Sequence, residues 1–111
     1  MNNVRNQGRF PVKAELHSAV LPNFKAEILD LSEGGARVRL RGRAADIAPE
    51  TRFGFGAFLS PRVNSVVKGN ARVAWVRETL DGVEAGLQWE DLTKAGISAL
   101  KSAILKAACP V

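Results

Sequence analysis

The sequence has a single cysteine and a single histidine among its 111 residues, and this scarcity excludes most catalytic and metal-binding arrangements. Cys109 alone cannot form an internal disulfide or a multi-cysteine metal site, which fits a reducing compartment. His17 is the only histidine that could act as a catalytic base, and its strand pattern places it on a polar surface face. No zinc-protease, P-loop or dinucleotide-binding motif is present. We therefore expect a protein that is not an enzyme and needs no metal or cofactor.

Long apolar runs are also missing. No run approaches the roughly 18 residues that a membrane-spanning helix needs, and the polar N-terminus has no signal-peptide core. We therefore expect a cytoplasmic protein that does not insert into a membrane. The apolar fraction of 46% and the charged fraction of 24% are those of a globular domain, and 111 residues suffice for one modest core.

Acidic residues are fewer than basic ones. Sixteen lysines and arginines stand against eleven acidic residues, which gives a net charge of +5. Such an excess favours an anionic partner, whether a nucleotide, a nucleic acid or an acidic surface. Most of the basic residues are arginines, whose planar guanidinium suits phosphates and guanine edges. Arg37, Arg39 and Arg41 alternate with apolar residues and predict a positive stripe on one strand face.

Alternation of apolar and polar residues predicts six strands, and a change to helical spacing after Trp89 predicts one helix. The predicted strands span residues 12–18, 25–31, 36–41, 53–59, 66–78 and 83–89, and the helix about 93–108. Asp81-Gly82 is a hairpin signal and Thr93 a helix N-cap. Short strands with few large aromatics predict a mostly β fold, a closed six-stranded antiparallel barrel with a C-terminal helix.

Residues 66–78 carry apolar side chains on both faces, so the pattern does not show which face is buried. Trp75 is therefore either a core residue or a surface platform, and the pattern alone favours the core. The turn at residues 30–35 combines a carboxylate, a hydroxyl and two adjacent glycines. Asp and Ser fold back on local backbone in turns, and glycine permits positive φ. Such a turn can present backbone N–H groups and a hydroxyl to a ligand at a strand end.

Two motifs carry a resemblance to a known family. Arg5 and Arg9 form RxxxR, and Asp30, Ser32 and Gly35 form DxSxxG. The first arises readily by chance, whereas the second is far rarer. Together, ahead of a six-strand-plus-helix pattern, they resemble the PilZ domain family, bacterial receptor domains for cyclic di-GMP that are six-stranded antiparallel barrels with a C-terminal helix. The resemblance covers nearly the whole chain, and residues 72–78 and 82–89 also look like that family's last strands.

The resemblance implies that cyclic di-GMP is the ligand and that the five motif residues bind it. By the same analogy Arg37, Arg39 and Trp75 could line the surface. Residues 1–11 are then a flexible basic arm, and residues 12–111 a single barrel domain with its helix. Ordering of the arm on binding would pass the second-messenger level to a downstream protein that controls motility, attachment or exopolysaccharide.

Two other functions remain open from the residues alone. One is a PilZ-like adaptor that works through protein contacts and binds no nucleotide, although it would need neither motif. The other is a basic barrel that binds RNA or single-stranded DNA. That function needs aromatic side chains among basic ones on an exposed sheet face, whereas the phenylalanines here stand at core-like positions. Nucleic acid is therefore not the expected partner.

Overall fold

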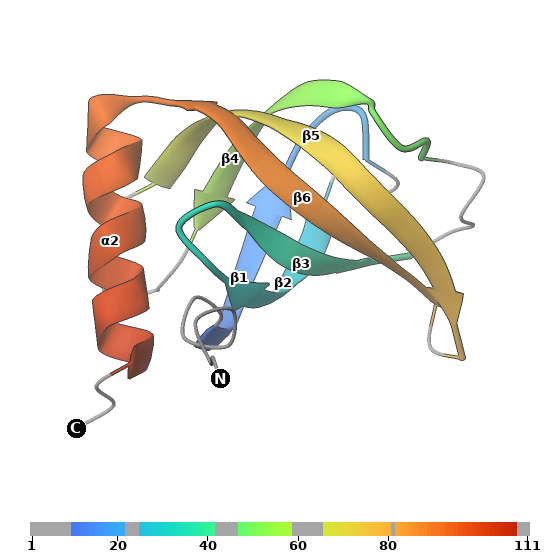
Figure 1. Ribbon diagram of the computed structural model, residues 1–111, viewed down its shortest axis with the longest axis horizontal. Coiled ribbons are helices and arrows are strands. Elements are labelled where there is room, and N and C mark those ends of the chain that lie inside the picture. Colours follow the sequence, from blue (N-terminus) through green and yellow to red (C-terminus); the bar gives the residue numbers. More distant parts are fainter. Residues whose placement is uncertain (1–9, 22–24, 42–46, 59–65, 81, 109–111) are drawn as a thin grey trace, which may run out of the picture.

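Six antiparallel strands close into a barrel, and a helix follows the last of them (Figure 1). The computed structural model describes residues 10–21, 25–41, 47–58, 66–80 and 82–108. The strands are β1 (Phe10–His17), β2 (Lys25–Leu31), β3 (Gly35–Leu40), β4 (Arg52–Phe58), β5 (Val66–Thr79) and β6 (Gly82–Leu92), and the helix is α2 (Lys94–Ala108). They run around the barrel in the order β1-β2-β3-β6-β5-β4, which confirms the fold expected from the sequence.

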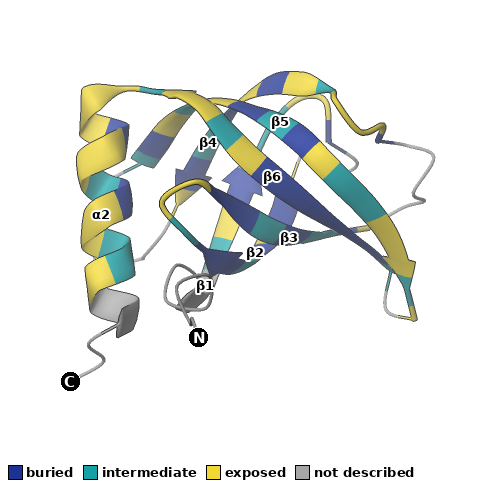
Figure 2. Ribbon diagram, viewed as in Figure 1, coloured by how far each residue is buried: buried dark blue, intermediate teal, exposed yellow. Residues whose placement is uncertain are grey.

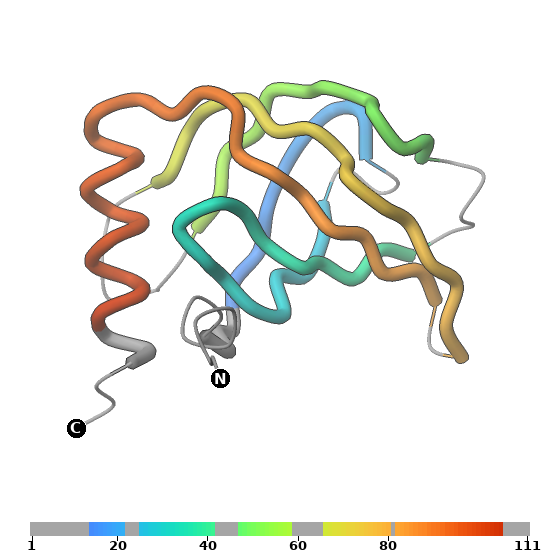
Figure 3. The backbone as a smooth tube through the Cα atoms, in the orientation of Figure 1, coloured from blue at the N-terminus to red at the C-terminus, as the bar shows by residue number. Residues whose placement is uncertain are grey.

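The strand boundaries agree with the alternation pattern to within two residues, except at the end of β6. That strand continues to Leu92, because Asp91 and Leu92 pair with Asn70 and Gly69 of β5. Two consecutive acidic residues hide this extension from a reading of apolar periodicity. The first strand begins at Phe10, two residues before its predicted start. β5 and β6 form the longest hairpin of the barrel, and their traces run side by side in Figure 3.

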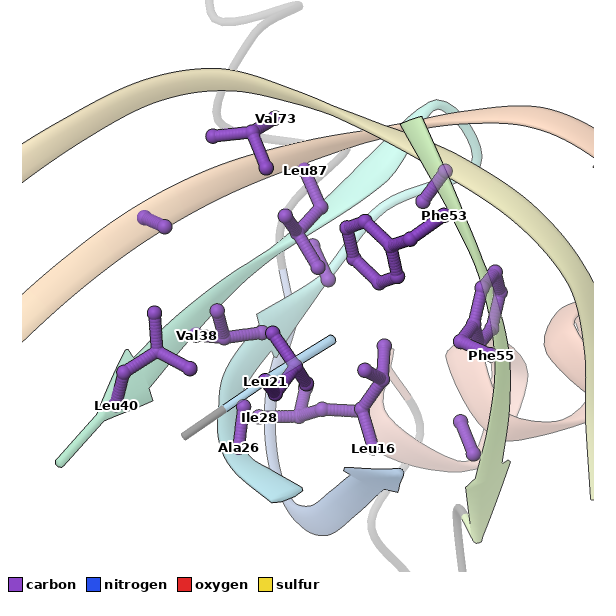
Figure 4. Packing of buried hydrophobic residues seen from close by; sticks show 14 of the residues in the cluster. Leu16, Leu21, Ala26, Ile28, Val38, Leu40, Phe53, Phe55, Val73 and Leu87 are labelled. Atoms are coloured by element: carbon purple, nitrogen blue, oxygen red, sulfur yellow. The ribbon is translucent and has the colours of Figure 1, made fainter. Parts of the chain in front are cut away.

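The core fills the inside of the barrel with one side chain from every second residue of the strands (Figures 2 and 4). The largest fully buried side chains are Leu16, Ile28, Leu31, Leu40, Val38, Val67, Val73 and Val83. Phe53 and Phe55 are buried as predicted, but Phe58 is exposed and meets His17 edge-on, so the phenylalanines are not all core residues. The burial of this apolar surface, at about 25 cal/mol per Å², is the main favourable contribution to folding.

The helix α2 begins where Thr93 caps it, as the sequence predicts. The Thr93 Oγ1 accepts a hydrogen bond from the Gly96 amide at 2.9 Å, which satisfies one of the unpaired donors of the first turn. The helix packs on β5 and β1 (Figure 1), and its own Leu100 is buried in the core. This arrangement covers one flank of the barrel and leaves the outer faces of β3 and β6 uncovered by α2.

Two β-bulges change which residues face outward. In β2, Ile28 pairs with Val38 but Asp30 pairs with Arg37, so Leu29 is an extra residue. A bulge shifts the inward–outward alternation by one residue. Asp30 therefore faces outward beside Arg37, while Ile28 and Leu31 both point into the core.

The second bulge lies in β5, where Val73 pairs with Leu87 and Trp75 with Gly86, leaving Ala74 extra. Its effect on Trp75 overturns the interpretation that the alternation pattern favours. Trp75 is only half-buried and lies outside the core cluster, whereas Val76 packs against that cluster. The indole is therefore on the outer surface of the barrel.

Candidate functional site

The turn between β2 and β3 closes on itself through Ser32. The Ser32 amide donates to the Gly35 carbonyl at 2.8 Å, and the Ser32 Oγ accepts from the Gly35 amide at 3.1 Å and lies 3.3 Å from its carbonyl. Glu33 and Gly34 stand exposed at the tip of this turn. The Ser32 hydroxyl thus stabilises the conformation of the turn, as serine does in local side-chain-to-backbone turns.

Trp89 of β6 holds this turn from the other side. Its amide donates to the Gly34 carbonyl at 2.8 Å, and its indole Nε1 donates to the Ser32 carbonyl at 3.3 Å. The ring stacks on Phe55, with centroids 5.0 Å apart, so the anchor is fixed to the core. The two hydrogen bonds hold the turn against β6 at Trp89.

The two glycines of the turn differ in their surroundings. A Cβ on Gly35 would lie 1.8 Å from the Leu87 carbonyl oxygen, whereas a Cβ on Gly34 would meet nothing within 4 Å. Neither glycine has a positive φ, so the expected use of glycine's conformational freedom is wrong here. Gly35 is required because the backbone of β6 approaches it closely, which alternation patterns do not reveal.

A chain of four charged groups runs from the turn across the outer face. The Arg37 Nε donates to the Asp30 Oδ2 at 2.9 Å, and the Arg37 Nη1 donates to the Glu84 Oε1 at 3.1 Å. The same Glu84 oxygen accepts from the Arg77 Nη2 at 2.8 Å. The two carboxylates are buried although they face outward, with Asp30 8% and Glu84 7% exposed.

Charge pairing shifts the pKa values of two of these groups, Glu84 and Arg37. The hydrogen bond from Arg77, reinforced by Arg37, lowers the pKa of Glu84 below its usual value against the opposing effect of burial. The hydrogen bond to Asp30 raises the pKa of Arg37 further above its already high value. Glu84 is therefore ionised at neutral pH, and its negative charge offsets the positive charge of the guanidinium groups bonded to it.

Trp75 lies beside this chain on the same row of the sheet. A Cβ on Gly86 would come within 2.1 Å of the Trp75 Nε1, so the indole rests directly on the bare backbone of β6. The Arg77 guanidinium lies 5.5 Å from the centre of the Trp75 ring, a cation–π distance. In register, Asp30 is opposite Arg37, Arg37 opposite Gly86, and Gly86 opposite Trp75.

The structure thus gathers most of the residues that the sequence singles out. Asp30, Arg37 and Trp75 share one row across four strands, and the Ser32–Gly35 turn joins β2 to β3 at its end. Arg39 lies one row away, where its Nη1 faces the Glu27 Oε1 at 3.7 Å. Arg5 and Arg9 lie outside the described residues.

Sequence reasoning missed Glu84, Gly86, Arg77 and Trp89, which complete the site. Glu84 and Gly86 look like ordinary polar-face positions of an alternating strand, because their neighbours come from β3 and β5 and not from nearby sequence. Trp89 looks like a core residue and does pack against the core, but its indole N–H has a second use at the turn. No signal in the linear pattern distinguishes these roles.

Neither a metal-ligating cluster nor a membrane-spanning helix is found in the stretches of chain that the structure describes. Within those residues no three histidine, cysteine or acidic side chains gather as a metal site would require. Nor does any helix in the described ranges have the length and apolar character needed to traverse a bilayer.

Comparison with known proteins is consistent with this geometry. The family model described as "PilZ domain" matches residues 2–106. Among solved structures, the PilZ domain of YcgR from Escherichia coli with c-di-GMP superposes with a TM-score of 0.68 at 15% identity, covering 90% of this chain and 88% of that one. YcgR from Escherichia coli in complex with c-di-GMP gives a TM-score of 0.67 at 14% identity, covering 88% of this chain but 43% of the YcgR chain. No curated protein matches the sequence.

Proposed function

We propose that this chain, which belongs to the PilZ domain family, is a receptor for cyclic di-GMP. The observation that carries the proposal is the Asp30–Gly35 turn, held against β6 and joined through Asp30 to an outward row of polar and aromatic side chains. The structural neighbours from Escherichia coli contain c-di-GMP, and their barrels share this fold. We propose no catalysis, because the site offers binding groups and no nucleophile–base pair among its described residues.

The described groups suit the guanine bases of such a ligand. An ionised carboxylate has about four lone-pair sites, so Asp30 can accept from a guanine edge while it remains bonded to Arg37. The Ser32 hydroxyl lies beside it at the turn, and Gly35 keeps the turn close to β6. Trp75 offers an aromatic surface on which a base can stack, with the Arg77 guanidinium next to it.

The phosphates require positive charge from elsewhere. Every arginine within the six strands already has a carboxylate partner, the longest of these pairs being 3.7 Å. These arginines are Arg37, Arg39, Arg52, Arg72 and Arg77. We therefore assign the phosphate contacts to Arg5 and Arg9 of the N-terminal arm, as the RxxxR motif implies, since guanidinium groups pair with phosphate through charge-assisted hydrogen bonds. Arg39 contributes to the general positive field of β3.

Calorimetric titration with cyclic di-GMP tests the receptor function. The unaltered chain is expected to bind near-stoichiometrically, and Arg9→Ala to lose the binding. Lys101→Ala is the matched control, because it removes one positive charge from an exposed position of α2, and it should bind as the unaltered chain does. If the unaltered chain gives no binding heat, the receptor function is wrong, and an adaptor that binds no nucleotide becomes the better explanation.

The output of the receptor is a further element of the proposal. We propose that the ligand orders residues 1–9, and that the ordered arm presents a face to a downstream cytoplasmic protein acting in motility, attachment or exopolysaccharide production. Fixing each backbone residue costs about 1–2 kcal/mol, so the ligand must supply this through its contacts with the arginines. Amide hydrogen exchange at residues 4–10 should slow when cyclic di-GMP is added. Unchanged exchange at saturating ligand would contradict this output.

A further inference from the structure

Glu84 is an unusual residue for the outer face of a barrel, because its carboxylate is buried there. It lies on β6 between Arg39 of β3 and Arg77 of β5 in register. A buried charge is costly unless it is both paired and hydrogen-bonded. Glu84 meets this requirement through two guanidinium groups, Arg37 and Arg77. Its strand, β6, lies between β3, which follows the turn, and β5, which contains Trp75.

The two arginines that Glu84 holds point in different directions. Arg37 uses its Nη1 for Glu84 and its Nε for Asp30, so it reaches toward the β2–β3 turn. Arg77 uses its Nη2 for Glu84 and places its guanidinium over Trp75. A single oxygen, Oε1, accepts from both. The same Glu84 oxygen therefore positions both Arg37, which bonds to Asp30, and Arg77, which lies over the Trp75 indole.

The two arginines differ in how much they depend on Glu84. Arg77 has its ion pair with Glu84, whereas Arg37 pairs with Asp30 as well. Most of the Arg77 side chain is exposed, at 61%, so packing restrains it little. Loss of the Glu84 charge would thus release Arg77 from the ring and leave Arg37 bonded on one side only. The backbone pairing of β6 with β3 and β5 does not depend on this side chain.

We propose that Glu84 is a positioning residue of the ligand surface, holding Arg37 against Asp30 and Arg77 over Trp75. Glu84 need not touch the ligand. It couples the turn, which binds one portion of the ligand, to the aromatic platform, which binds another. The expected effect on affinity rests on the proposed receptor function. The positions of Arg37 and Arg77 depend only on contacts within the ligand-free protein.

The test uses Glu84→Gln in the full chain, with Glu27→Gln as the matched control. Glu27 is on the same outer face and also pairs with an arginine, Arg39, so the change in charge is the same. Cyclic di-GMP affinity should fall about tenfold in Glu84→Gln, the ratio that loss of one charge-assisted hydrogen bond gives, and stay within about twofold in Glu27→Gln.

A second readout separates positioning from loss of stability. In ¹⁵N–¹H spectra of the ligand-free protein, the Trp75 indole signal, assigned with Trp75→Phe, should move in Glu84→Gln and stay in place in Glu27→Gln. The Trp89 indole, anchored on Ser32, should stay in place in both. Val67→Ala, a core change outside this network, should lower the thermal midpoint without moving the Trp75 signal.

The outcomes separate the two proposals. If the unaltered chain binds cyclic di-GMP and Glu84→Gln binds equally well, the positioning role is wrong and the receptor function stands. If the unaltered chain does not bind, the receptor function fails, and the indole signals alone decide whether Glu84 positions Arg77. Should Glu84→Gln not fold, the exposed Arg77→Ala replaces it. It should move the Trp75 signal and weaken binding, and an unmoved signal with full affinity would overturn the inference.

Discussion

At the scale of single residues, the two adjacent glycines of the turn should differ in how much stability the protein loses when each is replaced by alanine. Gly35 abuts the backbone of β6, and Gly34 faces open space. A Cβ that meets backbone atoms cannot be relieved by a rotamer change, because the strand itself must move. The requirement at Gly35 is therefore steric.

We expect Gly35→Ala to lower the free energy of unfolding by at least about 2 kcal/mol, since overpacking against fixed backbone costs of this order. The β2–β3 turn would also move away from Trp89, so cyclic di-GMP binding should weaken. Gly34→Ala is the control, with a change within about 0.5 kcal/mol, as surface substitutions usually give. Urea unfolding measures both, and equal stabilities of the two variants would contradict the assignment.

Gly86 has a comparable role for the indole. Gly86→Ala should lift Trp75 off β6, because the new Cβ would come within 2.1 Å of its Nε1. Gly54→Ala, on another outer strand face where a Cβ is 3.4 Å from the Asn70 side chain, should leave the indole in place. Tryptophan fluorescence should shift to the red in Gly86→Ala alone, as Trp75 becomes more exposed. Identical emission spectra for the two variants would refute this.

At the scale of elements, the bulges in β2 and β5 decide the content of the site. Each inserts one extra residue into the pairing of its strand, at Leu29 and at Ala74. A one-residue shift turns every following side chain to the other face. Without the two bulges, the carboxylate of Asp30 and the ring of Trp75 would point into the core, and the outward row would lose the residues at both of its ends.

The helix α2 allows a separate prediction at this scale. Thr93→Ala should lower the free energy of unfolding by about 1 kcal/mol, because the Gly96 amide loses its hydrogen-bond acceptor at the helix start. Ser98→Ala, at an exposed position inside the helix, should be neutral or slightly stabilising, since alanine has the higher helix propensity. Thermal unfolding followed by circular dichroism compares them. A destabilisation by Ser98→Ala as large as that by Thr93→Ala would argue against the cap.

At the scale of the whole molecule, the chain has an excess of positive charge, yet every arginine in its strands forms an ion pair with a carboxylate. The stability of the protein should therefore depend on pH through these ion pairs. The pKa of Glu84 in the folded protein lies below its ordinary value of 4.5, so its contribution to stability is present above that pH and is lost as pH falls through the lowered pKa.

We expect the difference in unfolding free energy between the unaltered chain and Glu84→Gln to be largest near neutral pH. The difference should shrink as pH falls below 4.5, because protonation of Glu84 then makes the two proteins alike in charge. Glu27→Gln should show a small difference throughout, since its exposed ion pair is worth no more than about 1 kcal/mol. Urea unfolding between pH 7 and about pH 3 gives the comparison. A difference that is constant over this range would be contrary to the paired state of Glu84.

Local pattern was enough to predict the strands, the hairpin that joins β5 to β6, the helix with its Thr93 cap and the family of the chain. These features depend on residues close in sequence: alternation, turn chemistry and short motifs. Closure of the barrel decided that Trp75 faces outward, that Gly35 must have no side chain and that Glu84 is buried between two arginines. Each of these depends on which residues of another strand lie opposite, and pairing across strands is set by the whole barrel.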